Sequence, residues 1–165
     1  MTRATISRGF VLPAKPEDFV GEVRVEVKLE NLIDRELAKR DIIAHDAVRS
    51  VTIDILVDTG TSTLVLPRHI VESLGLEMRE RAIVEYADGR HEEVDIAGTV
   101  LLSVSGRSAE TRCVVGPART EPLLGQIVLE MMDLLVDCPR HQLVPRPESP
   151  YMASYKLKIA ESREG

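Results

Sequence analysis

The sequence has no tryptophan, and its two phenylalanines and three tyrosines give an aromatic content of only 3%. A core built from this chain must therefore be largely aliphatic, and the aromatic platforms on which single-stranded nucleic acids stack are missing. The formal net charge of −6 also makes a phosphate backbone an unfavourable ligand. We therefore expect no nucleic-acid partner.

Long apolar runs and sorting signals are missing as well. No stretch reaches the about 18 consecutive apolar residues of a membrane-spanning helix. The N-terminal region carries Arg3, Arg8 and Lys15 without the apolar segment of a secretory signal. The composition, 44% hydrophobic and 29% charged over 165 residues, is typical of one soluble domain with a modest core. We expect a cytoplasmic protein with no membrane partner.

Cysteine is scarce, since the chain contains only Cys113 and Cys138. Both have apolar residues close to them in the sequence, a setting in which a free cysteine behaves as a small buried hydrophobic residue. In a reducing compartment disulfides are rare. We therefore expect two buried thiols rather than a disulfide.

Residues that could bind a cofactor do not form a convincing pattern. The glycines never gather into a phosphate-binding loop, and the serine-rich stretch 103–108 lacks the Gly-x-Ser-x-Gly order of a serine hydrolase. His91, Glu93 and Asp95 carry metal-ligating groups. Strand alternation, however, places these three side chains on one solvated face. We expect no metal and no other cofactor.

Residues 53–66 predict a buried strand, a sharp polar turn and a second buried strand. Asp58 ends the first strand, where burial disfavours a charged carboxylate unless hydrogen bonds compensate. Gly60 has no side chain, so backbone N–H groups can approach the carboxylate. Four nearby side chains carry hydroxyls: Thr59, Thr61, Ser62 and Thr63. The sequence therefore predicts a carboxylate that is stabilised within a turn.

The rest of the chain predicts many short strands and few short helices. Strands are expected at residues 21–30, 51–57, 63–66, 82–86, 92–96, 99–104, 112–115, 134–137 and 142–144. Helical segments are expected at residues 34–40, capped by Asp34, at 67–74, ended by Gly75, and at 125–132. Turns are expected at Asp88-Gly89, of type I′, at Gly98 and at Gly106. This pattern predicts an all-β domain, a closed or partly closed barrel with one or two short helices.

Asp58-Thr59-Gly60-Thr61, preceded by two apolar residues, resembles the catalytic loop of the aspartic proteases. A single copy in a short chain resembles the retropepsins, which act as homodimers with one aspartate from each subunit. Two further stretches follow in the family's order. Tyr86–Arg90 falls where the family has its flap, and Pro122–Gln126 is similar to its second signature, with Gly125 67 residues after Asp58 (125 − 58). The resemblance is closest to the bacterial single-domain retropepsin-like proteins.

This resemblance implies a fold, an activity and a set of site residues. It implies an acid-protease barrel over residues 20–147. By composition, residues 1–19, with two prolines and no sustained period, are expected to form an N-terminal arm, and residues 148–165, in a stretch rich in proline and charge, a C-terminal tail. It implies an aspartic endopeptidase that acts as a homodimer on a peptide or protein substrate, without a cofactor. The implied catalytic residues are Asp58, Thr59 and Gly60, with Thr61 supporting the carboxylate pair by a hydrogen bond. The implied flap and substrate-binding residues are Tyr86, Ala87, Asp88 and Gly89.

Other interpretations stay open at this point. Asp, Thr and Gly all favour turns, so the tripeptide alone is compatible with a purely structural turn. The same barrel could also be a non-catalytic dimerisation or peptide-binding module, because a fold does not fix a function. Such a module has no need of a buried aspartate pair that costs stability. Two features differ from the viral retropepsins. Gln126 lies where those proteins commonly have arginine. The insertion at residues 32–50 is longer than in those proteins, and it could cover the cleft or cap a sheet edge.

Overall fold

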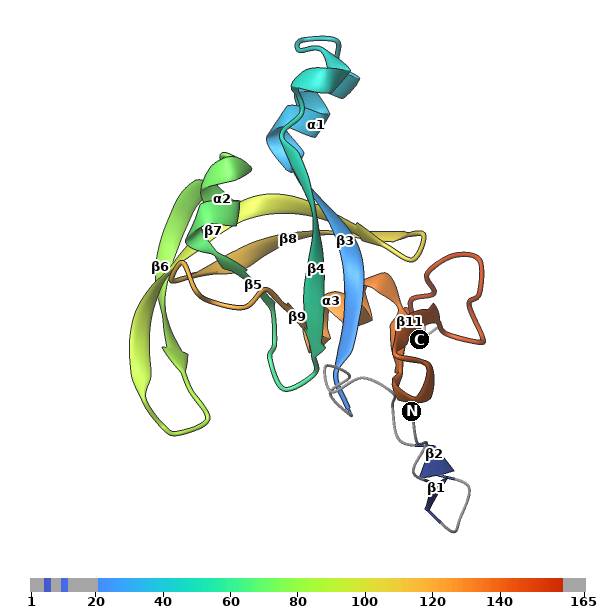
Figure 1. Ribbon diagram of the computed structural model, residues 1–165. Helices are drawn as coiled ribbons and strands as arrows, with labels where there is room; N and C mark the ends of the chain where they lie inside the picture. Colours follow the sequence, from blue (N-terminus) through green and yellow to red (C-terminus); the bar gives the residue numbers. More distant parts are fainter. Residues whose placement is uncertain (1–4, 7–9, 12–20, 159–165) are drawn as a thin grey trace, which may run out of the picture.

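The computed structural model describes residues 5–6, 10–11 and 21–158 of the chain (Figure 1). The predicted N-terminal arm, residues 1–19, lies outside the described residues except for two short strands that pair with each other. No helix in the described part is long and apolar enough to cross a membrane.

The secondary structure is dominated by strands, as the sequence predicts. The strands are β1 (Thr5–Ile6), β2 (Phe10–Val11), β3 (Val23–Asn31), β4 (Ser50–Asp58), β5 (Leu64–Pro67), β6 (Glu77–Glu85), β7 (His91–Val104), β8 (Arg107–Gly116), β9 (Leu123–Gly125), β10 (Leu134–Asp137) and β11 (Gln142–Pro145). The α-helices are α1 (Leu32–Lys39), α2 (Arg68–Ser73) and α3 (Gln126–Met132), and the 3-10 turns are η1 (His45–Ala47) and η2 (Cys138–Arg140).

Seven strands form one sheet in the order β3-β4-β9-β5-β8-β7-β6. Because β3 also pairs with β7, the strands from β3 to β7 in this order close into a barrel, and β6 extends from it as the outer strand of a hairpin with β7 (Figure 1). The barrel is filled by aliphatic side chains, as the low aromatic content predicts. The largest fully buried ones are Leu29, Ile55, Leu64, Leu66, Leu74, Leu102, Leu124, Leu129 and Met132. The predicted closed all-β barrel is therefore confirmed.

Strand β7 differs from the prediction of two strands separated by a turn at Gly98. It is continuous over His91–Val104, and an irregularity in its pairing with β8 between Ala97 and Val100 accommodates the glycine. A Cβ atom on Gly98 would lie 3.1 Å from the Cα of Arg112 on β8. The glycine is therefore suited to close strand packing rather than to a turn, and the predicted turn at Gly98 is wrong.

The insertion between β3 and β4 contains α1, which begins one turn earlier than expected. Asn31, not Asp34, is the N-cap, because its side chain accepts from the Asp34 N–H at 3.1 Å. Asp34 instead accepts from the Arg49 guanidinium at 2.7 and 2.9 Å, and this bonding lowers the pKa of Asp34 below its ordinary value. In Figure 1 the insertion projects from the end of the barrel opposite the loop that follows β4. It does not cover that loop.

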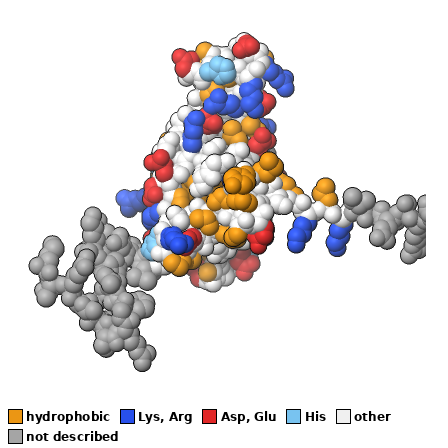
Figure 2. Space-filling view, turned by 90° about the vertical axis from the view of Figure 1, so that its right-hand side faces the viewer, with side chains coloured by type: hydrophobic (Ala, Val, Ile, Leu, Met, Phe, Trp, Pro, Cys, Tyr) orange, Lys and Arg blue, Asp and Glu red, His pale blue; other side chains and the backbone are white. Residues whose placement is uncertain are grey.

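The predicted helix before Gly75 is confirmed as α2, and Gly75 follows its C-cap with a φ of 60°. Pro67 ends β5 and serves as the N-cap residue instead of opening the helix. The face shown in Figure 2 carries interspersed acidic and basic side chains around the α1 end, while apolar side chains gather lower down.

The C-terminal segment is attached to the barrel by a buried carboxylate. Asp133, at the end of α3, accepts from Arg146 at 2.7 Å, from the Ser149 hydroxyl and from the Ser154 N–H at 3.1 Å. Arg107, also buried, donates to the Ser149 carbonyl oxygen at 2.5 Å. Residues 146–154 are therefore held more closely than their proline-rich sequence suggests.

The two cysteines are free, and they differ in environment. Cys113 is buried in the core, and burial raises the pKa of its thiol to about 12. Cys138 is exposed, so the prediction that both thiols are buried is wrong for Cys138. Its apolar sequence neighbours do not bury it because it begins η2, at the tip of the β10–β11 hairpin.

Candidate active site

The loop after β4 is held by two neighbouring elements, β9 and α3. Strand β9 lies between β4 and β5, parallel to β4, and it pairs Gly125 with Asp58. The N–H groups of Gln126 and Ile127, at the start of α3, donate to the carbonyl oxygens of Thr61 and Ser62 at 2.8 and 3.0 Å. The stretch predicted only to open a helix is thus a short strand that continues into α3.

Gly125 allows this close packing. A Cβ atom at Gly125 would lie 2.5 Å from the Thr63 nitrogen and 2.6 Å from the Ser62 carbonyl carbon. These are backbone atoms, so no side-chain movement could relieve the overlap. The glycine therefore fixes how closely β9 approaches the loop that carries Asp58.

Both oxygens of the Asp58 carboxylate accept a hydrogen bond from the same loop. The Gly60 N–H donates to Oδ1 at 2.9 Å, and the Thr61 hydroxyl donates to Oδ2 at 2.8 Å. Asp58 is half-buried, whereas Thr59 and Gly60 are exposed. Of the four nearby hydroxyls noted in the sequence, that of Thr61 donates to this carboxylate, and those of Thr59, Ser62 and Thr63 do not. The loop therefore orients a carboxylate and leaves it accessible from outside the core.

The register of the sheet shows which face the carboxylate shares. Side chains alternate between the two faces of a strand, and paired residues point to the same face. One row of paired residues points into the core: Val57, Leu124, Leu64, Cys113 and Ala97. The adjacent row points to the outer face and is half-buried: Leu56, Leu123, Val65, Val114 and Ile96. Asp58 follows Leu56 by two residues, so it lies on this outer, partly apolar face.

The β6–β7 hairpin carries the residues expected to form a flap. Gly89 donates to the Tyr86 carbonyl oxygen at 2.8 Å, and Tyr86 donates to that of Arg90 at 2.8 Å. Gly89 has a φ of 80°, but Asp88 does not have a positive φ. The loop is therefore a three-residue hairpin connection, and the predicted type I′ turn is wrong.

The four predicted flap residues, Tyr86 to Gly89, are all exposed. The Tyr86 hydroxyl donates to the Glu92 carboxylate at 2.7 Å, and this hydrogen bond raises the pKa of Tyr86 above its ordinary value. The Arg90 guanidinium lies 5.1 Å from the centre of the Tyr86 ring. The side chain is thus held by the hairpin itself. In Figure 1 the hairpin tip and the Asp58 loop lie toward the same end of the barrel.

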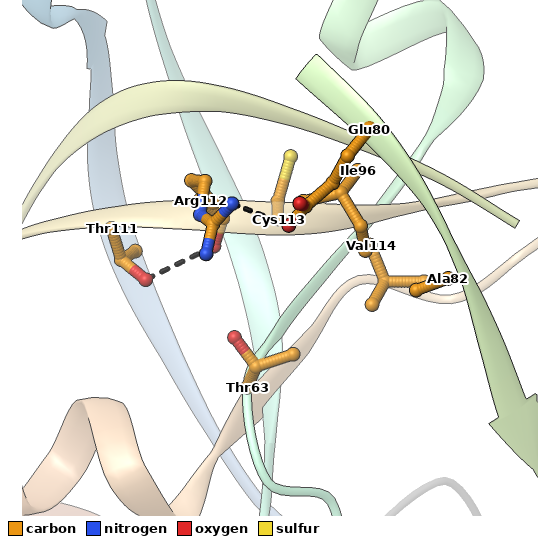
Figure 3. Close-up of a pocket in the computed structure, with 8 residues that line it drawn as sticks. All are labelled: Thr63, Glu80, Ala82, Ile96, Thr111, Arg112, Cys113 and Val114. Carbon is orange, nitrogen blue, oxygen red and sulfur yellow. Dashed lines mark hydrogen bonds and ion pairs between the residues drawn. The ribbon is translucent and has the colours of Figure 1, made fainter. Parts of the chain in front are cut away.

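A pocket of about 300 Å³ opens on the outer face between the base of this hairpin and the barrel (Figure 3). Its lining residues come from the loop before β5 and from β6, β7 and β8: Thr63, Glu80, Ala82, Ile96, Thr111, Arg112, Cys113 and Val114. Arg112 and Glu80 form an ion pair within it. Sequence reasoning missed this pocket, although the alternation of Arg112 and Val114 around buried Cys113 marks an outward-facing pair of positions.

No group of three or more His, Cys, Asp or Glu side chains is placed to hold a metal within the described residues. His91 and Glu93 are exposed, and Asp95 forms an ion pair with Arg68 at 2.9 Å. The side chains of 91, 93 and 95 thus lie at the surface, as strand alternation predicts.

A family model described as "Aspartyl protease" matches residues 47–128. Over this stretch the chain resembles the aspartyl proteases. The matched stretch contains the Asp58 loop, the β6–β7 hairpin, the pocket and β9. Among solved structures, one match is the EIAV protease complexed with the inhibitor HBY-793, at 23% identity over 48% of this chain and 76% of that chain, with a TM-score of 0.40. No curated protein matches the chain.

Proposed function

We propose that the protein is an aspartic endopeptidase whose active site forms from two copies of Asp58 in a homodimer. The observation that carries this proposal is the Asp58 carboxylate itself, accessible on the outer face with a hydrogen bond to each oxygen. One chain supplies one such carboxylate, whereas peptide hydrolysis by this chemistry needs two around one water. A twofold axis beside the Asp58 loop would place the carboxylate next to its own copy.

In this mechanism the two aspartates share one proton, because two carboxylates about 3 Å apart cannot both be ionised. The ionised Asp58 takes a proton from the water, which attacks the peptide carbonyl carbon. The protonated Asp58 of the other subunit donates to the carbonyl oxygen, and the roles reverse when the amine leaves. Gly60 and Thr61 hold the carboxylates in position, and Thr59 hydrogen-bonds across the axis.

The β6–β7 hairpin is the proposed lid. Residues Tyr86 to Gly89 close over an extended peptide and exclude water from the reaction. The half-buried outer row, which includes Val65 and Val114, provides an apolar floor for the same peptide. We propose residues 20–147 as the protease domain, with residues 148–165 as its tail.

The apolar floor also suits a peptide-binding module without catalysis, so the test must separate the two functions. We expect a peptide containing statine, whose hydroxyl mimics the tetrahedral transition state, to bind at least about 100-fold more tightly than the matching plain peptide. Titration calorimetry on wild-type protein and on Asp58→Asn measures both affinities. Equal affinities for the two peptides in the wild type would support the binding module and contradict the protease.

Thr61→Ala tests the hydrogen bond to the outer oxygen of Asp58. This hydrogen bond orients the carboxylate, and a hydrogen bond to a charged group contributes about 1.5–3 kcal/mol. We expect kcat/KM at one fixed pH to fall about tenfold in Thr61→Ala, because the carboxylate that takes the proton from water is then held less firmly.

Two variants serve as controls for this measurement. Thr61→Ser keeps a donor and should keep most of the wild-type kcat/KM. Ser62→Ala removes a neighbouring hydroxyl that makes no hydrogen bond to Asp58 and should leave kcat/KM unchanged. An unchanged kcat/KM in Thr61→Ala would show that Thr61 does not support the catalytic pair.

A further inference from the structure

The pocket beside the Asp58 loop has apolar walls and one ion pair. Ala82, Ile96 and Val114 form the walls, and Figure 3 shows Arg112 paired with Glu80 above Thr63. The ion pair joins β8 to β6, and its side chains are 56% and 53% exposed. The two charges of the pocket therefore neutralise each other while both remain accessible from the pocket.

The sheet register places this pocket on the same face as Asp58. Ile96 pairs with both Val114 and Glu80, and Val114 pairs with Val65 in the outward-pointing row. Three strand spacings of about 4.8 Å separate β4 from β8, so the β8 wall lies roughly 14 Å from Asp58. An extended peptide advances about 3.3 Å per residue. A peptide cleaved at Asp58 would therefore reach the pocket with a side chain three or four residues from the scissile bond.

The neutral pair decides which side chains the pocket can accept. A carboxylate entering it meets Arg112 as a partner but also meets Glu80 as a like charge, and an ammonium group meets the reverse. Either charged group loses hydration without a net electrostatic gain. An uncharged side chain loses less hydration and can contact the apolar walls.

We propose that this pocket is a substrate-recognition subsite for an uncharged side chain, and that the Arg112–Glu80 pair determines this selectivity. The inference rests on the proposed protease function and names the class of substrate that the site prefers. Neither residue touches the reacting atoms, so both determine specificity and neither is catalytic. Because a homodimer has two such pockets, the preference applies on both sides of the cleaved bond.

Reciprocal single variants test the proposal. Glu80→Gln leaves Arg112 unpaired, and Arg112→Gln leaves Glu80 unpaired. The substrates are peptides that differ only in leucine, glutamine, glutamate or lysine, placed three residues from the cleaved bond in one set and four in another. In the wild type we expect leucine or glutamine to give the highest kcat/KM. We expect the glutamate-to-lysine ratio of kcat/KM to rise about fivefold in Glu80→Gln and to fall about fivefold in Arg112→Gln.

Arg81 and Glu93 provide a matched control on the opposite face of the same hairpin. They form an ion pair at 3.1 Å with side chains 64% and 54% exposed, close to the exposure of the pocket pair. Arg81→Gln and Glu93→Gln change the net charge by the same amounts as the test variants. They should leave the ratio at its wild-type value.

Two outcomes overturn the inference in distinguishable ways. If wild type and variants show the same glutamate-to-lysine ratio of kcat/KM in both peptide sets, the proposed subsite is contradicted. The proposed protease function is then unaffected, because the peptides are still cleaved. If no peptide is cleaved and the statine peptide binds no better than the plain one, the proposed function fails and the subsite fails with it. Thermal unfolding of each variant shows whether it is folded during the assay.

Discussion

Replacing Asp58 with asparagine is expected to lower kcat/KM by about 10²–10⁴-fold, because the site then lacks a group that can take or give a proton in the reaction. The barrel should stay folded, since asparagine is nearly the same size and its side-chain oxygen can still accept from Gly60 or Thr61. Peptide cleavage and thermal unfolding measure the two effects separately. Asp54→Asn is the matched control, because Asp54 lies on the same strand with its side chain 63% exposed. Unchanged cleavage by Asp58→Asn would remove Asp58 from the mechanism.

Mixing wild-type protein with Asp58→Asn extends this prediction to the homodimer. If the subunits exchange freely at equal concentrations, about a quarter of the dimers carry two intact aspartates, whereas the wild-type chains are half of the total. Activity should therefore fall to about half of the value expected from dilution alone. A strictly proportional loss, with exchange verified by labelled subunits, would contradict a shared active site.

Gly125→Ala should have the largest effect on stability. The added methyl group would overlap backbone atoms of Ser62 and Thr63. These atoms have little room to move, because the carbonyl oxygens of Thr61 and Ser62 accept hydrogen bonds from α3. Overpacking of this kind costs roughly 1–3 kcal/mol, and we expect the upper part of that range. For a domain of this length, 3 kcal/mol lowers Tm by about 6–12 °C. Displacement of the loop should also reduce cleavage in protein that remains folded.

The neighbouring variant Gln126→Ala controls for this measurement. Among the described residues its side chain makes a hydrogen bond only to Glu130, one helical turn away, and the backbone bond to Thr61 survives the substitution. We expect little change in its Tm. A Gly125→Ala protein as stable as Gln126→Ala would show that the contact between β9 and the Asp58 loop is not as close as the structure has it.

The barrel could be predicted from local patterns wherever a strand alternates clearly, as in β3 and β4. Prediction failed where distant contacts decide the conformation. Gly98 favours a turn when judged by its sequence, but packing against Arg112 on β8 keeps it within a strand. Strand β9 has only three residues, and it is a strand because β4 and β5 lie on either side of it.

In the candidate site, too, the features set by neighbouring residues could be predicted and those set by distant contacts could not. The Asp58 loop is local, so the Gly60 and Thr61 donors could be expected from neighbouring residues in the sequence. The pocket is not local, because Glu80 and Arg112 are 32 residues apart and meet only through the register of β6, β7 and β8. A one-residue slip in that register would turn these side chains to the other face.

The half-buried outer row has a thermodynamic consequence for ligand binding. Leu56, Val65 and Ile96 keep part of their surface hydrated in the free protein. A peptide lying across the row removes that water, and burial of apolar surface lowers the heat capacity of the system. The enthalpy of peptide binding should therefore become more favourable as the temperature rises.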